Sequence, residues 1–178
     1  MPLTILYTDS RAPELDMERE IAGPDTVLVH ARKTRLDEVD PGALATCDGI
    51  VVNRIPIDAA AVARLTRCRI VVRNGVGFDV LDLKACGEAG IAACNVPDYG
   101  TTEVADSAIA AMLTFARGTA TYDAALRADV KSGWTHVHNV TSRRLRGACF
   151  GVVGLGRIGT AAALRARAFG MQDRKSVV

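Results

Sequence analysis

The sequence predicts an α/β fold built on parallel β-sheets, and three observations lead to that class. Short runs that are apolar throughout, such as Leu3–Tyr7 and Gly49–Asn53, alternate with amphipathic runs. A strand that is apolar at every position is typical of a parallel sheet whose two faces are both covered by helices. A glycine-rich turn, Gly154–Gly159, follows a later apolar run and precedes a helical one.

The first hundred residues contain the pattern of one doubly wound unit. Helices are expected at 14–22, ended by Gly23-Pro24, at 58–65 with Asp58 as N-cap, and at 82–89 with Gly90 just beyond the end. The expected strands are 3–7, 26–30, 49–53, 69–73 and 91–94. Residues 1–99 therefore predict a flavodoxin-like parallel sheet with a crevice at the carboxyl ends of its strands.

The rest of the chain begins with helices. Residues 101–117 predict a long helix, capped by Thr101 or Thr102 and ended by Gly118, that is apolar over much of its circumference. Such a helix is buried at a domain junction or against another subunit. A second helix is expected at 120–131, a basic irregular stretch at 135–146, a strand at 148–153 and a helix at 160–169.

Composition excludes several classes of protein. The 178 residues are 49% hydrophobic and 24% charged with a net charge of +2, which argues against disorder and against a dedicated nucleic-acid partner. No apolar run is long enough for a membrane span, and the N-terminus lacks the basic start of a signal peptide. Five scattered cysteines without a Cys-x-x-Cys pair favour reduced thiols and a cytoplasmic location.

The glycine turn carries the clearest chemistry. Gly154, Gly156 and Gly159 form the pattern G-x-G-x-x-G between a strand and a helix, where a dinucleotide pyrophosphate binds in Rossmann folds. Gly154 permits the tight turn, Gly156 lets the backbone approach a phosphate, and Gly159 lets the helix pack closely. The N–H groups of Arg157 and Ile158 are then directed at the phosphates. A purely structural turn is the alternative.

Several segments together resemble the D-isomer-specific 2-hydroxyacid dehydrogenases, in particular the branch similar to C-terminal-binding protein corepressors. They are Arg73–Asp79, Gly90–Asp98, Glu103–Asp106, Gly151–Gly159 and Arg167–Met171. The resemblance implies a substrate-binding (catalytic) domain at 1–99 and the first part of a Rossmann nucleotide-binding domain at 100–171. It also implies hydride transfer between NAD or NADP, with NAD favoured, and a small 2-hydroxy or 2-keto acid, in a homodimer formed through the helices of 101–131.

The resemblance also implies a substrate loop at Arg73, Gly75, Val76 and Gly77. Glycine N–H groups at a strand's carboxyl end suit a carboxylate, and Arg73 can add a charge-assisted hydrogen bond, although an exposed strand-end arginine is an equal alternative. Val76, in the same loop, and Val104, in the following helix, match positions that lie near the cofactor in related proteins.

The catalytic Arg, Glu and His of this family all follow the glycine motif. Here His30, His136 and His138 precede it, so we assign no catalytic residue. No third ligand accompanies the pair His136 and His138, so we expect no metal site. Asp173 lies too early to bind the cofactor ribose, and the matching position is Val177.

Residues 172–178 resemble nothing in the family and form a non-family tail. The codons GAT CGG AAG AGC GTC GTG TAG, familiar from sequencing adapters, encode Asp173–Val178 and a stop, so we expect a gene cut short and an inactive N-terminal fragment. An NAD-sensing, corepressor-like interaction protein without catalysis is the alternative. A third possibility is a fragment without function, whose second domain holds one strand with two unpaired edges.

Overall fold

The computed structural model describes residues 2–136 and 142–176, and the side chains of residues 2–136 and 142–172. The chain divides into two compact units, Met1–Tyr99 and Gly100–Val178, called unit 1 and unit 2 below. No helix of the described residues is both long and apolar enough to cross a membrane.

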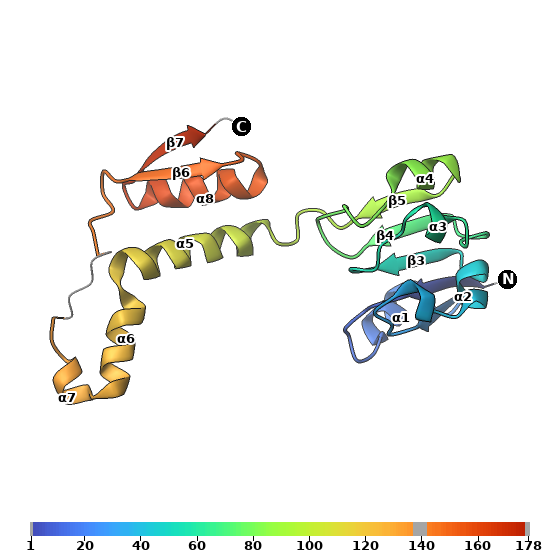
Figure 1. Cartoon of the computed structure of the whole chain (residues 1–178), viewed down its shortest axis with the longest axis horizontal. Helices are drawn as coiled ribbons and strands as arrows, with labels where there is room; N and C mark the ends of the chain where they lie inside the picture. Colours follow the sequence, from blue (N-terminus) through green and yellow to red (C-terminus); the bar gives the residue numbers. More distant parts are fainter. Residues whose placement is uncertain (1, 137–141, 177–178) are drawn as a thin grey trace. The chain divides into compact units, whose positions relative to one another are not determined.

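Unit 1 is a five-stranded sheet in the order β2-β1-β3-β4-β5, and every pair of neighbouring strands is parallel (Figure 1). The predicted flavodoxin-like sheet is therefore confirmed. Every strand agrees with its predicted range to within one residue. The strands are β1 (Leu3–Tyr7), β2 (Thr26–His30), β3 (Gly49–Val52), β4 (Ile70–Arg73) and β5 (Ala92–Asn95).

Aspartate caps define three short helices of unit 1. The carboxylates of Asp58 and Asp82 accept the N–H groups of Ala61 and Ala85 at 2.8 and 2.9 Å. Asp40 caps a helix that the sequence pattern did not predict, although Asp40 followed by Pro41 is a typical helix start. The helices are α1 (Asp16–Ala22), the 3-10 turn η1 (Leu36–Glu38), α2 (Pro41–Thr46), α3 (Ala59–Val62) and α4 (Leu83–Glu88).

The core of unit 1 is built from large aliphatic side chains. Leu6, Ile50 and Val71, one from each of the three central strands, have at most 1% of their surface exposed. Helix residues such as Leu44 and Val62 pack against them. Burying a side chain of this size contributes about 1.5–3 kcal/mol. The sheet therefore has a continuous core that fixes the positions of its loops.

Unit 2 begins with helices that differ from the predicted ones at their ends. Gly100, without any side-chain cap, precedes the long helix, so neither Thr101 nor Thr102 caps it. The predicted helix 120–131 is two helices, because Asp129 is extended and its carboxylate accepts the N–H of Lys131 at 2.9 Å. The helices are α5 (Thr101–Arg117), α6 (Thr119–Ala128) and α7 (Val130–Gly133).

The second half of unit 2 is a strand, a helix and a second strand. They are β6 (Cys149–Val153), α8 (Arg157–Ala168) and β7 (Gln172–Ser176). β7 pairs in parallel with β6, from Cys149 opposite Gln172 to Val153 opposite Ser176. The expectation of a single strand is therefore wrong. Ladder hydrogen bonds come from the backbone, so the family-like side chains that the tail lacks were not needed for pairing.

Helices α5 and α8 pack through small side chains. Ala105 on α5 and Ala162, Ala163 and Ala166 on α8 are buried. Small residues let two helix backbones approach closely. At this interface Arg165 Nε donates to Asp106 Oδ1 at 2.6 Å. The helix that follows the glycine turn is thus held on the long helix α5 through its middle and its carboxyl half.

Candidate functional site

The glycine turn of unit 2 lies between β6 and α8. Gly154 directly follows the last residue of the strand and has a φ of +84°, a conformation that favours glycine. Gly156 is the N-cap residue of α8, and no side chain caps this helix end. The N–H of Thr160 makes the helical bond to the carbonyl of Gly156 at 2.9 Å. This helix start therefore follows the strand directly and has no side-chain cap from its N-cap residue.

The space around these glycines differs from one to the next. A Cβ at Gly159 would overlap the carbonyl oxygen of Gly154 and lie 3.0 Å from Val152 Cγ1, so the helix packs on the strand as closely as a glycine permits. A Cβ at Gly156 would meet nothing within 4 Å. The backbone at Gly156 therefore borders open space. The first turn of α8 contains no acidic side chain, and its dipole favours an anion there.

The loop that follows β4 in unit 1 contains the four predicted substrate-loop residues. Gly75 is buried with a φ of +153°, and a Cβ there would overlap the guanidinium of Arg73. The Arg73 side chain thus folds back over its own loop. The N–H of Gly75 donates to the carbonyl of Arg73 at 2.8 Å. Gly75 therefore does not offer the free N–H group that was expected of it. Val76 and Gly77, the next residues that were expected to bind substrate, are exposed.

The end of β5 holds this loop in place. The side-chain amide of Asn95 donates to the carbonyl of Val76 at 2.7 Å, and the N–H of Val96 donates to the carbonyl of Gly75 at 3.0 Å. Two carbonyls of the loop are thus turned toward β5. Sequence reasoning did not single out Asn95. Its only signal was a polar side chain at the end of an apolar strand.

The remaining predicted cofactor residues belong to unit 2. Val104 lies in the first turn of α5 and is half exposed, and Ile158 and Arg157 are exposed at the start of α8. The structure thus brings Gly154, Gly156, Arg157, Ile158 and Gly159 together in one turn, and places Val104 on the helix that packs against α8.

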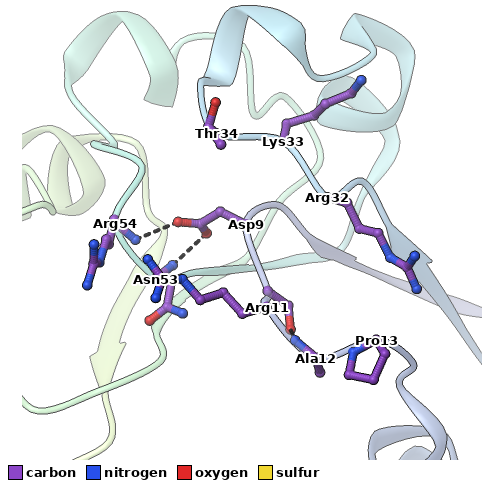
Figure 2. Close-up of a pocket in the computed structure, with 10 residues that line it drawn as sticks. Asp9, Arg11, Ala12, Pro13, Arg32, Lys33, Thr34, Asn53 and Arg54 are labelled. Atoms are coloured by element: carbon purple, nitrogen blue, oxygen red, sulfur yellow. Dashed lines mark hydrogen bonds between the residues drawn. The ribbon is translucent and has the colours of Figure 1, made fainter.

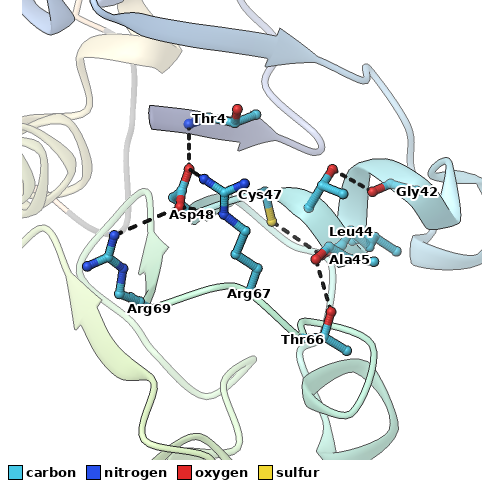
Figure 3. A network of polar contacts seen from close by, with 10 residues as sticks. Thr4, Gly42, Leu44, Ala45, Cys47, Asp48, Thr66, Arg67 and Arg69 are labelled. Carbon is cyan, nitrogen blue, oxygen red and sulfur yellow. Dashed lines mark hydrogen bonds and ion pairs between the residues drawn. The ribbon is translucent and has the colours of Figure 1, made fainter. Parts of the chain in front are cut away.

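A second polar cluster lies at the opposite, amino-terminal edge of the sheet in unit 1 (Figure 3). The buried carboxylate of Asp48 accepts the N–H of Thr4 at 2.9 Å and both Nε and Nη2 of Arg67 at 3.0 and 3.1 Å. The Thr4 N–H, followed by the Arg67 guanidinium, lowers the pKa of Asp48. Because ligands of open α/β sheets bind at the carboxyl edge, this cluster is structural.

Two thiols lie close to Asp48. Cys47 is buried completely and Cys68 almost completely. The thiol of Cys47 donates to the carbonyl of Leu44 at 3.4 Å, and the thiol of Cys68 donates to the carbonyl of Ile70 at 3.2 Å. The interaction between the two thiols lowers the pKa of Cys68 to about 7, and the same interaction, with burial, raises the pKa of Cys47. Their burial keeps both sulfurs away from a dissolved substrate. All five cysteines are free thiols, and Cys94 and Cys149 are exposed.

The histidines do not form a catalytic or metal-binding arrangement in the described part of the chain. Nδ1 of His30 accepts a hydrogen bond from Nε of Arg32 at 3.2 Å. His136 is exposed, with Nδ1 3.5 Å from the hydroxyl of Tyr122. His138, its expected neighbour, lies outside the described residues. Among the described side chains, those of residues 2–136 and 142–172, no cluster of three or more His, Cys, Asp or Glu could hold a metal.

The chain matches one family model over most of its length. The model describes the catalytic domain of D-isomer specific 2-hydroxyacid dehydrogenases, and it matches residues 5–169. This range includes the loop after β4 and the turn before α8.

Two relatives show similarity in sequence. The chain is 34% identical over 125 residues to C-terminal-binding protein 1 of Caenorhabditis elegans, covering 68% of this chain and 17% of that protein. It is 32% identical over 161 residues to a glyoxylate reductase of Korarchaeum cryptofilum, covering 89% of this chain and 45% of that protein. The chain therefore spans less than half the length of either relative.

Solved structures have the same fold. A D-lactate dehydrogenase from Aquifex aeolicus, crystallised with NAD and lactic acid, matches with a TM-score of 0.83 at 24% identity, over 98% of this chain and 51% of that one. An NADPH-dependent glyoxylate/hydroxypyruvate reductase from Sinorhizobium meliloti, crystallised with NADP and malonate, matches with a TM-score of 0.80 at 29% identity. The match covers 98% of this chain and 53% of that one.

Proposed function

The chain belongs to the D-isomer specific 2-hydroxyacid dehydrogenase family, and we propose that it carries the substrate-binding domain and the phosphate-binding turn of an NAD(P)-dependent oxidoreductase. The reaction is oxidation of the CH–OH group of a 2-hydroxy acid, or reduction of a 2-keto acid such as glyoxylate or hydroxypyruvate. The observation that carries this proposal is the uncapped start of α8 beside the open space at Gly156.

NAD or NADP is the expected cofactor, with NAD favoured. When bound, its nicotinamide accepts or donates the hydride. The chain's own part is to hold the pyrophosphate with the N–H groups of Arg157 and Ile158, since a helix start favours an anion. Gly154 and Gly159 shape the turn, and Val76 and Val104 offer only backbone or shape to the cofactor.

Arg73 and its loop are the expected carboxylate-binding part of unit 1. The guanidinium lies over Gly75 at the carboxyl end of β4, where it can donate charge-assisted hydrogen bonds to a substrate carboxylate. The N–H of Gly77 is a further expected donor. Because Asn95 holds the carbonyl of Val76, the loop is kept in one conformation before the substrate arrives.

The 178 residues alone are expected to be inactive or nearly so. Proton transfer needs an acid or base within hydrogen-bond reach of the reacting oxygen. The family's Glu-paired His follows the glycine motif, whereas all three histidines here precede it. We expect no turnover of glyoxylate or hydroxypyruvate with NADH or NADPH. Robust turnover in a continuous absorbance assay would contradict this expectation.

Cofactor binding is tested with two glycine variants of the full chain. Gly156→Val should fold, because nothing lies within 4 Å of its new Cβ, but its side chain should obstruct the phosphate. We expect NADH binding, measured by fluorescence titration, to weaken at least about tenfold, which corresponds to about 1.4 kcal/mol. Gly151→Val on β6, which also meets open space, is the matched control and should change binding less than about twofold. Equal effects of the two substitutions would refute the site.

A dinucleotide-sensing interaction protein without catalysis is the second candidate function. The similarity to C-terminal-binding protein 1, the most identical relative quoted above, favours it. The two candidates differ in what NADH does. A sensor binds a protein partner more tightly with NADH and shows no turnover in a version that extends past Met171, whereas a dehydrogenase extended in this way turns over a 2-keto acid.

A homodimer formed through the helices of 101–131 is also proposed. These helices and the residue after α7 expose large apolar side chains, and an isolated monomer rarely presents a large apolar patch to water. They are Val104, Phe115, Val130 and Trp134. Sedimentation velocity should therefore detect a dimer that Val130→Glu weakens. A chain that stays monomeric at high concentration would contradict the proposal.

A further inference from the structure

A cavity of about 470 Å³ opens at the carboxyl edge of the sheet in unit 1 (Figure 2). Its walls are the loops that follow three strands, namely residues 9–13 after β1, 32–34 after β2 and 53–54 after β3. In the order β2-β1-β3, the chain moves from β1 to one side for β2 and to the other side for β3. This is the topological switch point, where open α/β sheets bind their ligands.

The one acidic side chain among the lining residues is committed to the backbone. Asp9 Oδ1 accepts the N–H of Asn53 at 2.7 Å and the hydroxyl of Thr8 at 2.9 Å. Asp9 Oδ2 accepts the N–H groups of Arg54 and Ile55 at 2.6 and 3.1 Å. The carboxylate thus fixes the loop after β3 to the loop after β1. Its acceptor capacity is used by these four donors, so it competes weakly for the surrounding cations.

Four cationic side chains line the same cavity. Arg54 lies on one side of Asp9 and Arg32 and Lys33 on the other, and Arg11 lies below it in the view of Figure 2. Within the described residues, Arg11, Lys33 and Arg54 form no ion pair, and Arg32 pairs with an exposed glutamate, Glu14, at 3.4 Å. The cavity therefore carries an excess of positive charge that the described residues neutralise only at Arg32.

The backbone at Arg32 adds an independent observation. Its φ is +54°, a left-handed conformation that is unfavourable for a side chain of this kind. Strained residues of this type concentrate at ligand sites, where surrounding contacts hold them. Here the N–H groups of Ala31 and Lys33 bond to the carbonyls of Tyr7 and Thr8, at 2.9 and 2.8 Å, and fix the loop on β1.

We propose that this cavity binds a small molecule through a phosphate or a comparable multivalent anion. Arg11 and Arg54 supply planar donor groups suited to phosphate oxygens, and Lys33 supplies a point charge. The hydroxyls of Ser10 and Thr34 add neutral donors. The anion is either free inorganic phosphate or the phosphate group of a larger ligand. The proposal depends on unit 1 alone and not on the proposed dehydrogenase function.

Equilibrium titration of the full chain tests the affinity. Inorganic phosphate and glycerol 3-phosphate, titrated calorimetrically at low ionic strength, should both bind, and added salt should weaken binding. Arg11→Gln and Arg54→Gln should each weaken binding about tenfold, as expected for one lost charge-assisted hydrogen bond. Lys84→Gln, on the exposed face of α4 and away from the cavity, is the control and should have no effect. Tighter binding of the ester identifies a larger ligand, and equal binding identifies the free anion.

Mapping the bound site separates this proposal from the cofactor site. In ¹⁵N-labelled Gly156→Val, whose glycine turn is obstructed, phosphate should still shift the amide signals of residues 9–12, 32–34 and 53–54. Gly156→Val should weaken the binding of NADH and not that of phosphate, and Arg11→Gln should weaken the binding of phosphate and not that of NADH. No binding at millimolar phosphate by a folded chain would overturn the proposal. So would shifts confined to 154–159, or an equal loss in Lys84→Gln.

Discussion

Unit 1 and unit 2 differ in the size of the side chains that they bury. The core of unit 1 contains leucine, isoleucine and valine from β1, β3 and β4 and from the helices and loops that cover them. Among the described residues of unit 2, the buried apolar side chains are mostly alanines, with Ile109 and Val152 as the larger ones. A two-stranded sheet is also marginal without wider packing. A glycine turn can therefore have its expected local geometry in a unit with little core of its own.

The largest expected difference is in amide hydrogen exchange. Amides of β3 and β4 in unit 1 should exchange at least about 100-fold more slowly than those of β6 in unit 2, because local opening costs less where few large side chains are buried. Exchange followed by mass spectrometry, corrected for intrinsic rates, measures the ratio. Uniform protection along the chain would contradict the comparison and would indicate that unit 2 is stabilised by contacts beyond its own core.

Core truncation should affect the two units separately. Ile50→Ala on β3 should lower the free energy of unfolding of unit 1 by about 2–5 kcal/mol, because the side chain is almost fully buried at the centre of the sheet. Urea unfolding followed by a signal from unit 1 measures the change. Ile109→Ala on α5 is the matched control, since it removes a buried isoleucine from unit 2 and should leave the unit 1 transition in place. A shift of both transitions by either variant would show that the units unfold together.

The Asp48 cluster gives unit 1 a pH dependence. The pKa of Asp48 in the folded chain lies below its ordinary value of 3.8, mainly because of the Thr4 N–H. Its ionised form therefore stabilises the fold above that value, and the stabilisation is lost as the pH falls through the lower folded pKa. Asp48→Asn should lower the urea midpoint of unit 1 at pH 7 and reduce the difference between pH 7 and pH 3.

An exposed pair provides the control for Asp48. Asp37 pairs with Arg35 on the surface, and Asp37→Asn should change the midpoint much less. Should the two variants lose the same amount of stability at pH 7, the burial of Asp48 would have no special importance.

The smallest expected effect concerns the ion pair between α5 and α8. Arg165 and Asp106 approach at 2.6 Å, but both side chains are partly exposed. A double-mutant cycle of Arg165→Gln and Asp106→Asn should give a coupling energy of about 0.2–1 kcal/mol for unit 2. A coupling several times larger would mean that this pair, and not the alanine packing, positions α8.

Local sequence signals predicted most of the elements. Alternating apolar and amphipathic runs located all five strands of unit 1, and Asp58 and Gly118 marked helix ends that the structure has. The helix predicted at 120–131 was wrong because a helix-start signal lies within its apolar pattern. Asp129 sits inside an apparently continuous helical run, but its carboxylate starts a new helix.

Long-range contacts could not be predicted in the same way. The N–H of Gly75 is bonded within its loop, and the carbonyl of Val76 is bonded to Asn95, 19 positions away. The pairing of β7 with β6 depends on backbone geometry, which a tail without family-like residues did not indicate. Such features follow from how the strands are ordered, and a linear pattern does not contain that order.

Periodicity, caps and glycine positions are local properties of the chain, so the α/β class, the glycine turn and the family resemblance could all be predicted from the residues. The meeting of Asp9, Arg32 and Arg54 at one cavity, in contrast, became visible only in the folded chain. Their meeting depends on β1 lying between β2 and β3. Strand order is set by burial of the whole sheet, so the charges at its carboxyl edge are brought together only once the core has formed.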